Sequence, residues 1–476
     1  MKNPLAFRQH VLLWLACSAI FFEAFDVSVV NLALPLLADD LGLPLAAVQW
    51  VQTIYLMSFG GFLLLGGRLC DHAGSRQIFL TGMLLFGSAS AVGACSHHLG
   101  WLLPARAGQG IGAALAMPAG ISLLSEHFTE PRQQQAAFGV FGAFAAIGFA
   151  GGLAIGGVIA SCLDWHWIFG MNVPVITAVV VAGHRWIPRN KPAKSSPLQT
   201  PMAIWLTITL LLLSYGVHES ATGGWKAATC LLTALLSGIA LRRTDRRQSR
   251  PFFGRGIYTD PGHYSILGAF ALLGATFLPF VFICAFSLQG MPGWDTLTTG
   301  LLLFPYSIGS ALVSRLLLPR LYQAIGVRRT GILSIGCLLA GDLLLAAGIW
   351  HHLLVCWLIA LLLVNSLSIA IGYPAFTVLS LEGVPADKQG IAAGLQSSLY
   401  TMGSGLGLSL TGLCMQAFQS GGWGGKGMAG GGMAHGAGGT GVVPLLACCG
   451  VIGGLCLAAA LLLLRKPKNT YLCPPI

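Results

Sequence analysis

Long apolar segments separated by short polar connections run along almost the whole chain of 476 residues. A helix that crosses a membrane needs about 20 mainly apolar residues, and on that basis the pattern predicts fourteen crossings. The predicted segments are 10–37, 48–69, 77–96, 100–125, 136–162, 167–187, 201–217, 225–241, 263–288, 296–318, 330–350, 352–380, 390–419 and 442–464. The pattern therefore predicts an all-α integral membrane protein.

Composition and charge agree with this reading. Hydrophobic residues make up 55% of the chain and charged residues only 9%, whereas soluble proteins carry about 25% charged residues. If the N-terminus lies in the cytoplasm, all but three of the 26 Lys and Arg residues fall on the cytoplasmic side. The exceptions are Lys226 and Lys426 outside and Arg106 within a segment. Because positive loops face the cytoplasm, we expect a multi-pass bacterial inner-membrane protein with both termini cytoplasmic, and no nucleic-acid partner.

A repeated element divides the chain into two halves. Residues 69–76 and 321–328 both read L-x-x-x-x-G-x-R, and each stretch follows the second segment of a set of six if 201–217 and 225–241 are an insertion. The predicted organisation is an N-terminal six-helix bundle (1–190), two inserted helices and a linker (191–245), and a C-terminal six-helix bundle (246–476). Parallel repeats with a midplane site between them are typical of transporters.

Three acids fall inside predicted segments. Asp26 and Glu23 share one helical face of the first segment, three residues apart, and Asp342 lies in the eleventh. A carboxylate costs about 2.5–3.5 kcal/mol at the centre of a membrane helix. Because acids are rarely kept there without a function, these residues are predicted to be proton or cation sites. A helix-packing role is the alternative for each of the three.

Arg106 is the one basic residue well inside a segment. An unpaired arginine there would be costly, so we expect an acidic or carbonyl partner, with Asp26 or Glu23 preferred. Outward snorkelling of a structural arginine is the alternative. These four residues, Asp26, Glu23, Arg106 and Asp342, form the predicted proton-coupling set.

Several motifs, in the same order along nearly the whole chain, resemble the major facilitator superfamily and most closely its fourteen-helix drug:proton antiporter branch. Asp26 to Pro35 is similar to that branch's D-x-T-x-V-N-x-A-L-P signature, with Ser28 for threonine. Residues 106–114 (RAGQGIGAA) resemble R-x-x-Q-G-x-G-x-A. The resemblance implies two six-helix bundles plus two inserted helices, and a cycle in which Asp26 binds and releases a proton.

The connection at 67–76 (GRLCDHAGSR) resembles the superfamily loop G-x-L-x-D-x-x-G-R-[KR], with Ser75 in place of the first basic residue. The glycines permit a tight turn, and charge-assisted bonds can latch one conformation. The resemblance implies a cytoplasmic gate; an ordinary loop is the alternative. The predicted gating residues are Gly67, Asp71, Gly74 and Arg76.

The fifth segment resembles the exporter element G-x-x-x-G-P-x-x-G-G. Its small residues allow close helix packing, but Leu153 stands where the family has proline. The predicted packing positions are Gly148, Gly152, Gly156 and Gly157. The stretch 164–174 (DWHWIFGMNVP) is similar to the branch's W-R-W-I-F-x-x-N-x-P, with His166 for arginine.

Polar side chains elsewhere are candidates for a substrate cavity. Gln396 and Tyr400 share a helical face and either line a cavity or bond a neighbouring helix. Residues 288–305 are similar to the branch's helix 9–10 junction. The candidate cavity residues are Gln52, Tyr55, Gln109, Gln289, Tyr306, Gln396 and Tyr400.

The expected function is proton-coupled export of lipophilic or cationic drugs or metabolites. No C-x-x-C pair, H-E-x-x-H motif, Walker A motif or hydrolase signature occurs in the sequence. We therefore expect no metal, no cofactor and no enzyme activity, and the proton gradient is the expected energy source. The expected partners are a small-molecule substrate, protons and the lipid bilayer; a periplasmic adaptor stays open, although no sequence feature indicates one.

Two other functions stay open. One is proton-coupled uptake of a nutrient or siderophore, because the element that distinguishes exporters from importers in the superfamily lacks its proline at Leu153. The other is a non-transporting membrane sensor or assembly partner, for which we would expect an appended soluble domain. The glycine-rich stretch 420–441 is expected to be a flexible outer loop.

Overall fold

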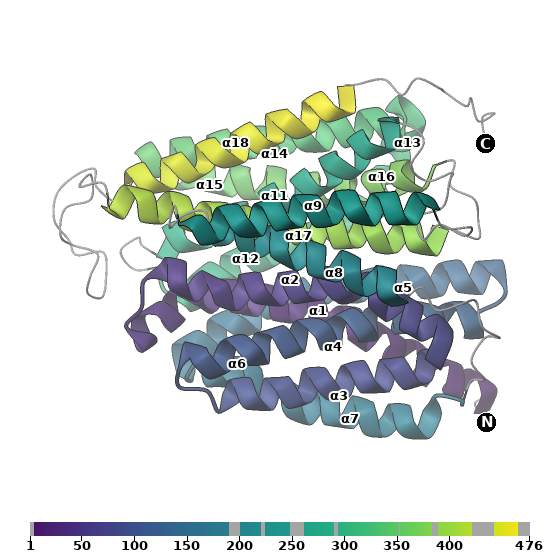
Figure 1. Ribbon diagram of the computed structural model, residues 1–476. Helices are drawn as coiled ribbons and strands as arrows, with labels where there is room; N and C mark the ends of the chain where they lie inside the picture. The colour runs from purple at the N-terminus through teal and green to yellow at the C-terminus, as the bar shows by residue number, and fades with distance from the viewer. Residues whose placement is uncertain are drawn as a thin grey trace.

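The computed structural model describes residues 4–189, 200–219, 224–247, 261–289, 294–351, 353–382, 389–420 and 442–464. The described residues are helical apart from short turns and connections, and no strand occurs among them. The helices form two bodies that lie side by side with their long axes roughly aligned (Figure 1).

The first body contains the helices up to residue 186, drawn in purple and blue in Figure 1. They are α1 (Pro4–Leu41), α2 (Leu45–Ala73), α3 (Ser75–Ala94), α4 (Leu99–His127), α5 (Pro131–Cys162), α6 (His166–Gly170) and α7 (Asn172–Trp186). The sixth predicted segment is thus split between α6 and α7. The apolar faces of α1 to α4 meet in a buried cluster that includes Phe59, Phe79, Phe86 and Leu123.

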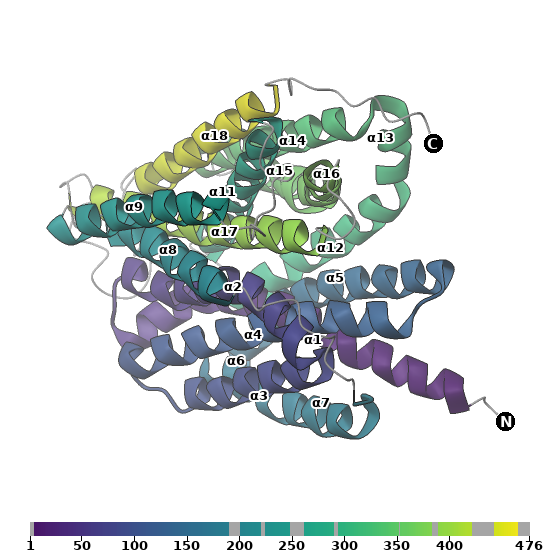
Figure 2. The same cartoon turned by 45° about the vertical axis from the view of Figure 1, so that its right-hand side comes forward.

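The second body contains the helices from residue 261 onward. They are α11 (Pro261–Gln289), α12 (Thr296–Leu316), α13 (Leu318–Ile325), α14 (Val327–His351), α15 (Leu354–Leu361), the π-helix η2 (Leu362–Ser368), α16 (Ile369–Leu381), α17 (Gln389–Ser420) and α18 (Val442–Leu464). In Figure 1 the beginning of α1 and the end of α18 lie at the same, right-hand end of the molecule, as an even number of passes requires; Figure 2 shows the two bodies from a second direction.

Two further helices, α8 (Thr200–Glu219) and α9 (Trp225–Arg247), pack against each other on the outside of the two bodies. Helix α8 contacts α2 of the first body and α17 of the second. The Thr207 hydroxyl donates a 2.5 Å hydrogen bond to the Gly61 carbonyl, which ties α8 to α2. The pair therefore lies along the seam between the bodies.

Helices occur at all fourteen predicted ranges, but the count of fourteen crossings is not confirmed. Among the described residues, eleven helices are long and apolar enough to cross a membrane. Helices α8, α9 and α17 are not among them. Helix α9 ends in several arginines, and α17 is rich in Gly, Ser, Thr and Gln. A helix buried between two bodies can be more polar than a lipid-facing one, so apolarity alone does not settle the count.

The predicted repeat has a structural counterpart. Gly74 (φ 93°) and Gly326 (φ 79°) each separate two helices in a backbone conformation that favours glycine. Arg76 Nη2 donates to the His184 carbonyl on α7 at 2.8 Å, and Arg328 Nε donates to the Leu463 carbonyl on α18 at 3.1 Å. Each repeat arginine thus binds the last helix of its own body.

Candidate functional site

A buried charged group lies between α1, α2 and α4. Asp26 on α1 and Arg106 on α4 are both 0% exposed. Arg106 Nη1 donates to Asp26 Oδ2 at 2.5 Å, which makes the pair a salt bridge. The expectation that an acid would pair with Arg106 is met by Asp26, and no hydrogen bond between Arg106 and Glu23 occurs in the described residues.

The remaining donors of Arg106 are held by neighbouring helices. Its Nε donates to the Val51 carbonyl on α2 at 2.9 Å, and Nη1 also donates to Gln109 Oε1 at 2.9 Å. Its Nη2 donates to Gln52 Oε1 at 3.3 Å. The guanidinium carbon lies 4.3 Å from the centre of the Tyr55 ring, close enough for a cation–π interaction. The arginine therefore has several partners besides Asp26.

Three residues predicted to line a substrate cavity belong instead to this network. Gln52 and Gln109 bind Arg106, and Gln109 Nε2 also donates to Ser90 Oγ at 2.8 Å and to Asp26 Oδ1 at 3.4 Å. Tyr55 is fully buried, and its hydroxyl has no hydrogen-bond partner among the described residues. Ser90 and the Val51 carbonyl were not singled out from the sequence, because no local pattern marks them.

The chemistry open to this network is a change of protonation at Asp26. While Asp26 is ionised, its charge and that of Arg106 cancel. Protonation would break the ion pair and leave a buried guanidinium without its counter-charge, which is costly. The network therefore has two states, one with Asp26 ionised and one with Asp26 protonated, and the two favour different packing of the helices around Arg106.

Glu23 lies one turn before Asp26, and its side chain is half-buried. It lies within electrostatic range of Tyr55 in its own body and of Tyr373 and Tyr400 in the second body. Those two rings meet edge to face, with centroids 5.1 Å apart. Phe270 lies 5.2 Å from each of them. A carboxylate of one body thus lies within electrostatic range of an aromatic cluster of the other, and of this cluster only Tyr400 was predicted.

Asp342 lies apart from the network, on α14 of the second body. It is 1% exposed, and its Oδ1 has no hydrogen-bond partner among the described residues. Its neighbours include the Cys449 thiol and Gly453 of α18. The sequence placed Asp342 with the proton-coupling residues; the structure places it between α14 and α18.

The other predicted cavity residues make contacts between helices. Gln289 Nε2 donates to the Leu32 carbonyl across the two bodies at 3.3 Å. The Tyr306 carbonyl accepts a hydrogen bond from Ser366 at 2.8 Å. Gln396 binds Ser380 and Thr377 of α16. Of the two roles left open for Gln396, the structure thus shows the bond to a neighbouring helix.

The four glycines of the α5 element lie at close helix contacts. A Cβ added at Gly148 would lie 2.5 Å from the Phe21 carbonyl oxygen, and one at Gly152 would lie 2.0 Å from Ser28 Oγ. Gly156 likewise meets α1, whereas Gly157 meets the start of α12 in the other body. Helix α5 runs unbroken through Leu153. These glycines bring α1, α5 and α12 into contact beside Asp26.

The predicted gating connection forms the sharp turn between α2 and α3. Gly74 takes the positive φ, and a Cβ added at Gly67 would meet only Pro118, at 4.0 Å. Ser75, which replaces a basic residue of the family motif, donates to Glu126 on α4 at 2.8 Å. The side chain of Asp71 lies outside the described residues, as do the stretch 421–441 and the basic tail 465–476.

A second polar contact lies at the opposite end of the first body. Trp165 Nε1 donates to Asp40 Oδ2 at 2.7 Å and so joins the α5–α6 connection to the end of α1. His166 stacks on Trp165, with ring centres 3.8 Å apart, and its Nε2 lies 3.0 Å from the Ser96 carbonyl oxygen. The tryptophan belongs to a motif noted from the sequence, whereas its partner Asp40 was not predicted.

Comparison with known proteins gives a consistent result. The model of the Major Facilitator Superfamily matches residues 16–408. The puromycin resistance protein of Streptomyces alboniger is 35% identical over 331 residues, which cover 68% of this chain and 64% of that protein. The chain thus matches less than two thirds of that relative's length. The methyl viologen resistance protein SmvA of Salmonella typhimurium is 30% identical over 421 residues, covering 86% of this chain and 83% of that protein.

Solved structures share the fold at low sequence identity. The crystal structure of an auto-inhibited peptide transporter of the POT family aligns with a TM-score of 0.68 and 16% identity, covering 98% of both chains. At this identity the likeness concerns the fold alone.

Proposed function

Because the chain belongs to the major facilitator superfamily, we propose that it is a proton-coupled exporter of lipophilic cations, drugs or metabolites. The observation that carries the proposal is the buried Asp26–Arg106 ion pair. A buried ion pair contributes little net stability, because the cost of removing two charges from water offsets their attraction. Ionisable residues inside a membrane protein are therefore candidates for a functional site. The names of the relatives, which refer to puromycin and methyl viologen resistance, support export.

In this mechanism the proton and the substrate compete through charge. Glu23 and Asp26 lie on neighbouring turns of α1, so a cation at Glu23 favours the ionised form of Asp26. A proton that reaches Asp26 from the outside removes that charge and weakens the hold on the cation. The two bodies then rock about the seam, and Asp26 releases its proton to the cytoplasm as the ion pair with Arg106 forms again. Asp342 is the proposed second protonation site.

The proposed substrate class follows from the groups that face the seam. Glu23 supplies a negative charge, and Phe270, Tyr373 and Tyr400 supply aromatic faces. The faces of aromatic rings attract cations, including organic cations such as quaternary ammonium groups. A flat or bulky lipophilic cation suits this combination better than an anion or a sugar.

The proposed topology has fourteen crossings of a bacterial inner membrane, with both termini cytoplasmic. It keeps the three units 1–190, 191–245 and 246–476. The distribution of Lys and Arg over the connections supports this orientation. It places the turn at Gly74 on the cytoplasmic side and the Trp165–Asp40 contact on the outer side.

The test is the uptake of tetraphenylphosphonium into inside-out vesicles whose lumen is more acidic than the medium. Wild type should accumulate the cation, and Asp26→Asn should lose the part that depends on the pH gradient while remaining folded and inserted. Asp39→Asn is the matched control, because it makes the same change at an exposed position on α1. Full coupled transport by Asp26→Asn would contradict the assigned role, and movement of substrate together with protons would indicate uptake.

A further inference from the structure

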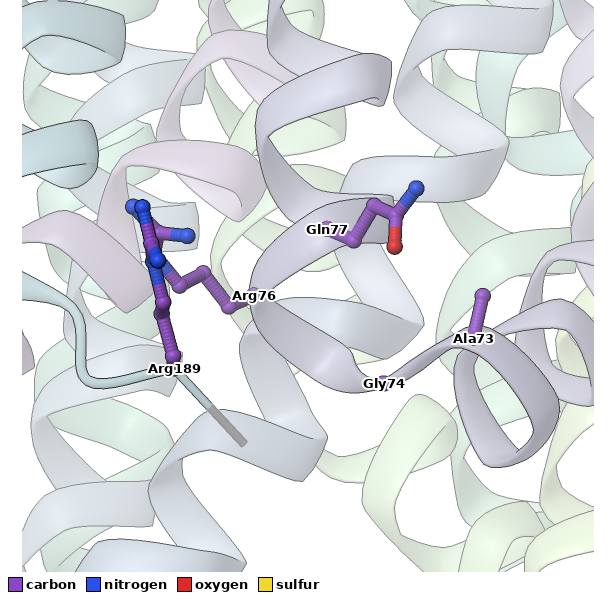
Figure 3. Close-up of a pocket in the computed structure, with 5 residues that line it drawn as sticks. All are labelled: Ala73, Gly74, Arg76, Gln77 and Arg189. Atoms are coloured by element: carbon purple, nitrogen blue, oxygen red, sulfur yellow. The ribbon is translucent and has the colours of Figure 1, made fainter. Parts of the chain in front are cut away.

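A cavity of about 210 Å³ lies at the turn between α2 and α3, and none of its lining residues belongs to the Asp26 network. Its lining residues are Ala73, Gly74, Arg76, Gln77 and Arg189. Figure 3 shows that Arg76, at the start of α3, and Arg189, just beyond α7, reach the same side of the cavity. Two guanidinium groups from different parts of the chain therefore share one small space.

The charges in this cavity are not balanced by its own lining. None of its five described lining residues is acidic. Arg76 gives Nη2 to the His184 carbonyl, a neutral acceptor, at 2.8 Å. Its Nε is buried and has no hydrogen-bond partner among the described residues. Like charges repel at close range, so two arginines side by side favour an anion between them.

The donors present define the anion. Guanidinium groups bind the oxygens of phosphate in paired, charge-assisted hydrogen bonds. The site lies at the end of α2, α3 and α7 that the charge distribution places at the cytoplasmic membrane surface. Basic pockets between transmembrane helices at this level bind anionic lipid head groups.

We propose that Arg76 and Arg189 bind one phosphate group at the cytoplasmic membrane surface, and that an anionic phospholipid head group supplies it. The bound phosphate would connect the α2–α3 turn to the segment after α7. Because Arg76 also binds α7 directly, occupancy of the site would hold the turn in the conformation described here. The proposal needs no assumption about the transported substrate.

The experiment measures binding of phosphatidylglycerol to the purified full-length protein by native mass spectrometry, with phosphatidylcholine as the zwitterionic comparison. Wild type should retain one phosphatidylglycerol more tightly than the rest. Arg189→Gln should weaken that binding about tenfold, in line with the loss of a charge-assisted contact. Arg185→Gln is the matched control, since it removes the same charge from an exposed arginine of α7 that does not line the cavity.

Titration with inorganic phosphate, followed by thermal unfolding in detergent, separates the two sources of the anion. Stabilisation by phosphatidylglycerol but not by millimolar phosphate, lost in Arg189→Gln only, supports the lipid site. Equal, Arg189-dependent stabilisation by inorganic phosphate would overturn the lipid assignment. Equal losses of lipid binding in Arg189→Gln and Arg185→Gln would show a general charge effect and no site, and unchanged binding in both variants would also overturn the proposal.

Discussion

Arg106 on α4 and Asp26 on α1 form a salt bridge of 2.5 Å in which both side chains are fully buried. The arginine is held independently by the Val51 carbonyl and by Gln52. These two acceptors are neutral, so the positive charge of Arg106 is balanced in its salt bridge by Asp26. Asp26 is the member of the pair that can change state.

The first prediction concerns Arg106→Gln. The substitution leaves Asp26 buried without its cation, and breaking such a pair costs about 3–5 kcal/mol. We expect a lower unfolding temperature in detergent and loss of proton-coupled transport. The double variant Asp26→Asn/Arg106→Gln should recover much of the stability, because no charge is left unpaired, but it should not recover coupling. If the double variant were no more stable than Arg106→Gln, the ion pair would not be the source of the loss.

The charge network could be predicted in part from the sequence. The cost of an unpaired intramembrane charge was enough to expect an acidic or carbonyl partner for Arg106, with Asp26 or Glu23 preferred, and the structure shows both Asp26 and the Val51 carbonyl. The helix rotations that turn Gln52, Tyr55 and Gln109 toward the same point depend on packing between segments that lie far apart in sequence. For this reason these three residues were assigned to a cavity, although they are fully buried around Arg106.

The second prediction concerns the contact between α5 and α1. In Gly152→Ala the new methyl group would lie 2.0 Å from Ser28 Oγ and 2.5 Å from the Phe25 carbonyl oxygen. The serine can rotate but the backbone cannot, so the helices must separate. Overpacking of this kind costs about 1–3 kcal/mol, and we expect lower thermal stability together with slower transport.

The control for this variant is the neighbouring glycine. A Cβ at Gly151 would meet nothing within 4 Å, so Gly151→Ala should leave transport intact and gain up to about 1 kcal/mol of helix stability. Thermal unfolding and transport by the two variants, measured side by side, test the contact. Similar behaviour of the two would show that close approach of α1 and α5 is not needed.

The fold was predictable wherever apolar length decides it, and less so elsewhere. Helix α18 is a continuous apolar run without a charged residue, as expected of a helix long and apolar enough to cross a bilayer. Helix α17 is covered by α2 and α11, so it can carry polar residues and does not stand out by apolarity. The break between α6 and α7 and the π-helix η2 leave no local signal that periodicity detects.

The third prediction concerns Asp342, the proposed second protonation site. Asp342→Asn keeps the size of the side chain and removes its charge. We expect the variant to transport the cation with fewer protons per cycle. The steady-state concentration gradient of the cation should then depend less steeply on the imposed pH difference. Asp26→Asn should instead lose that dependence altogether. An unchanged dependence in Asp342→Asn would assign this acid a packing role between α14 and α18.

The fourth prediction uses the pH dependence of a group outside the membrane-spanning segments. Asp295 caps the start of α12, where its Oδ1 accepts a hydrogen bond from the Thr298 amide at 2.8 Å. The hydrogen bonds from Thr298 lower the pKa of Asp295 below its ordinary value. A lowered pKa in the folded state means that the cap stabilises the protein above about pH 4, the ordinary carboxyl value. This contribution is lost as the pH falls through the folded-state pKa.

Asp295→Ala should therefore be less stable than wild type at pH 7, by about 1 kcal/mol for the loss of an N-cap. The difference should shrink as the pH is lowered below 4, because the protonated carboxyl of wild type is a weaker acceptor. Unfolding temperatures in detergent at a series of pH values give the difference directly, with Asp164→Ala as a control for removal of an exposed carboxylate. A difference that stayed constant down to the lowest pH would show that the charge of Asp295 contributes nothing to the cap.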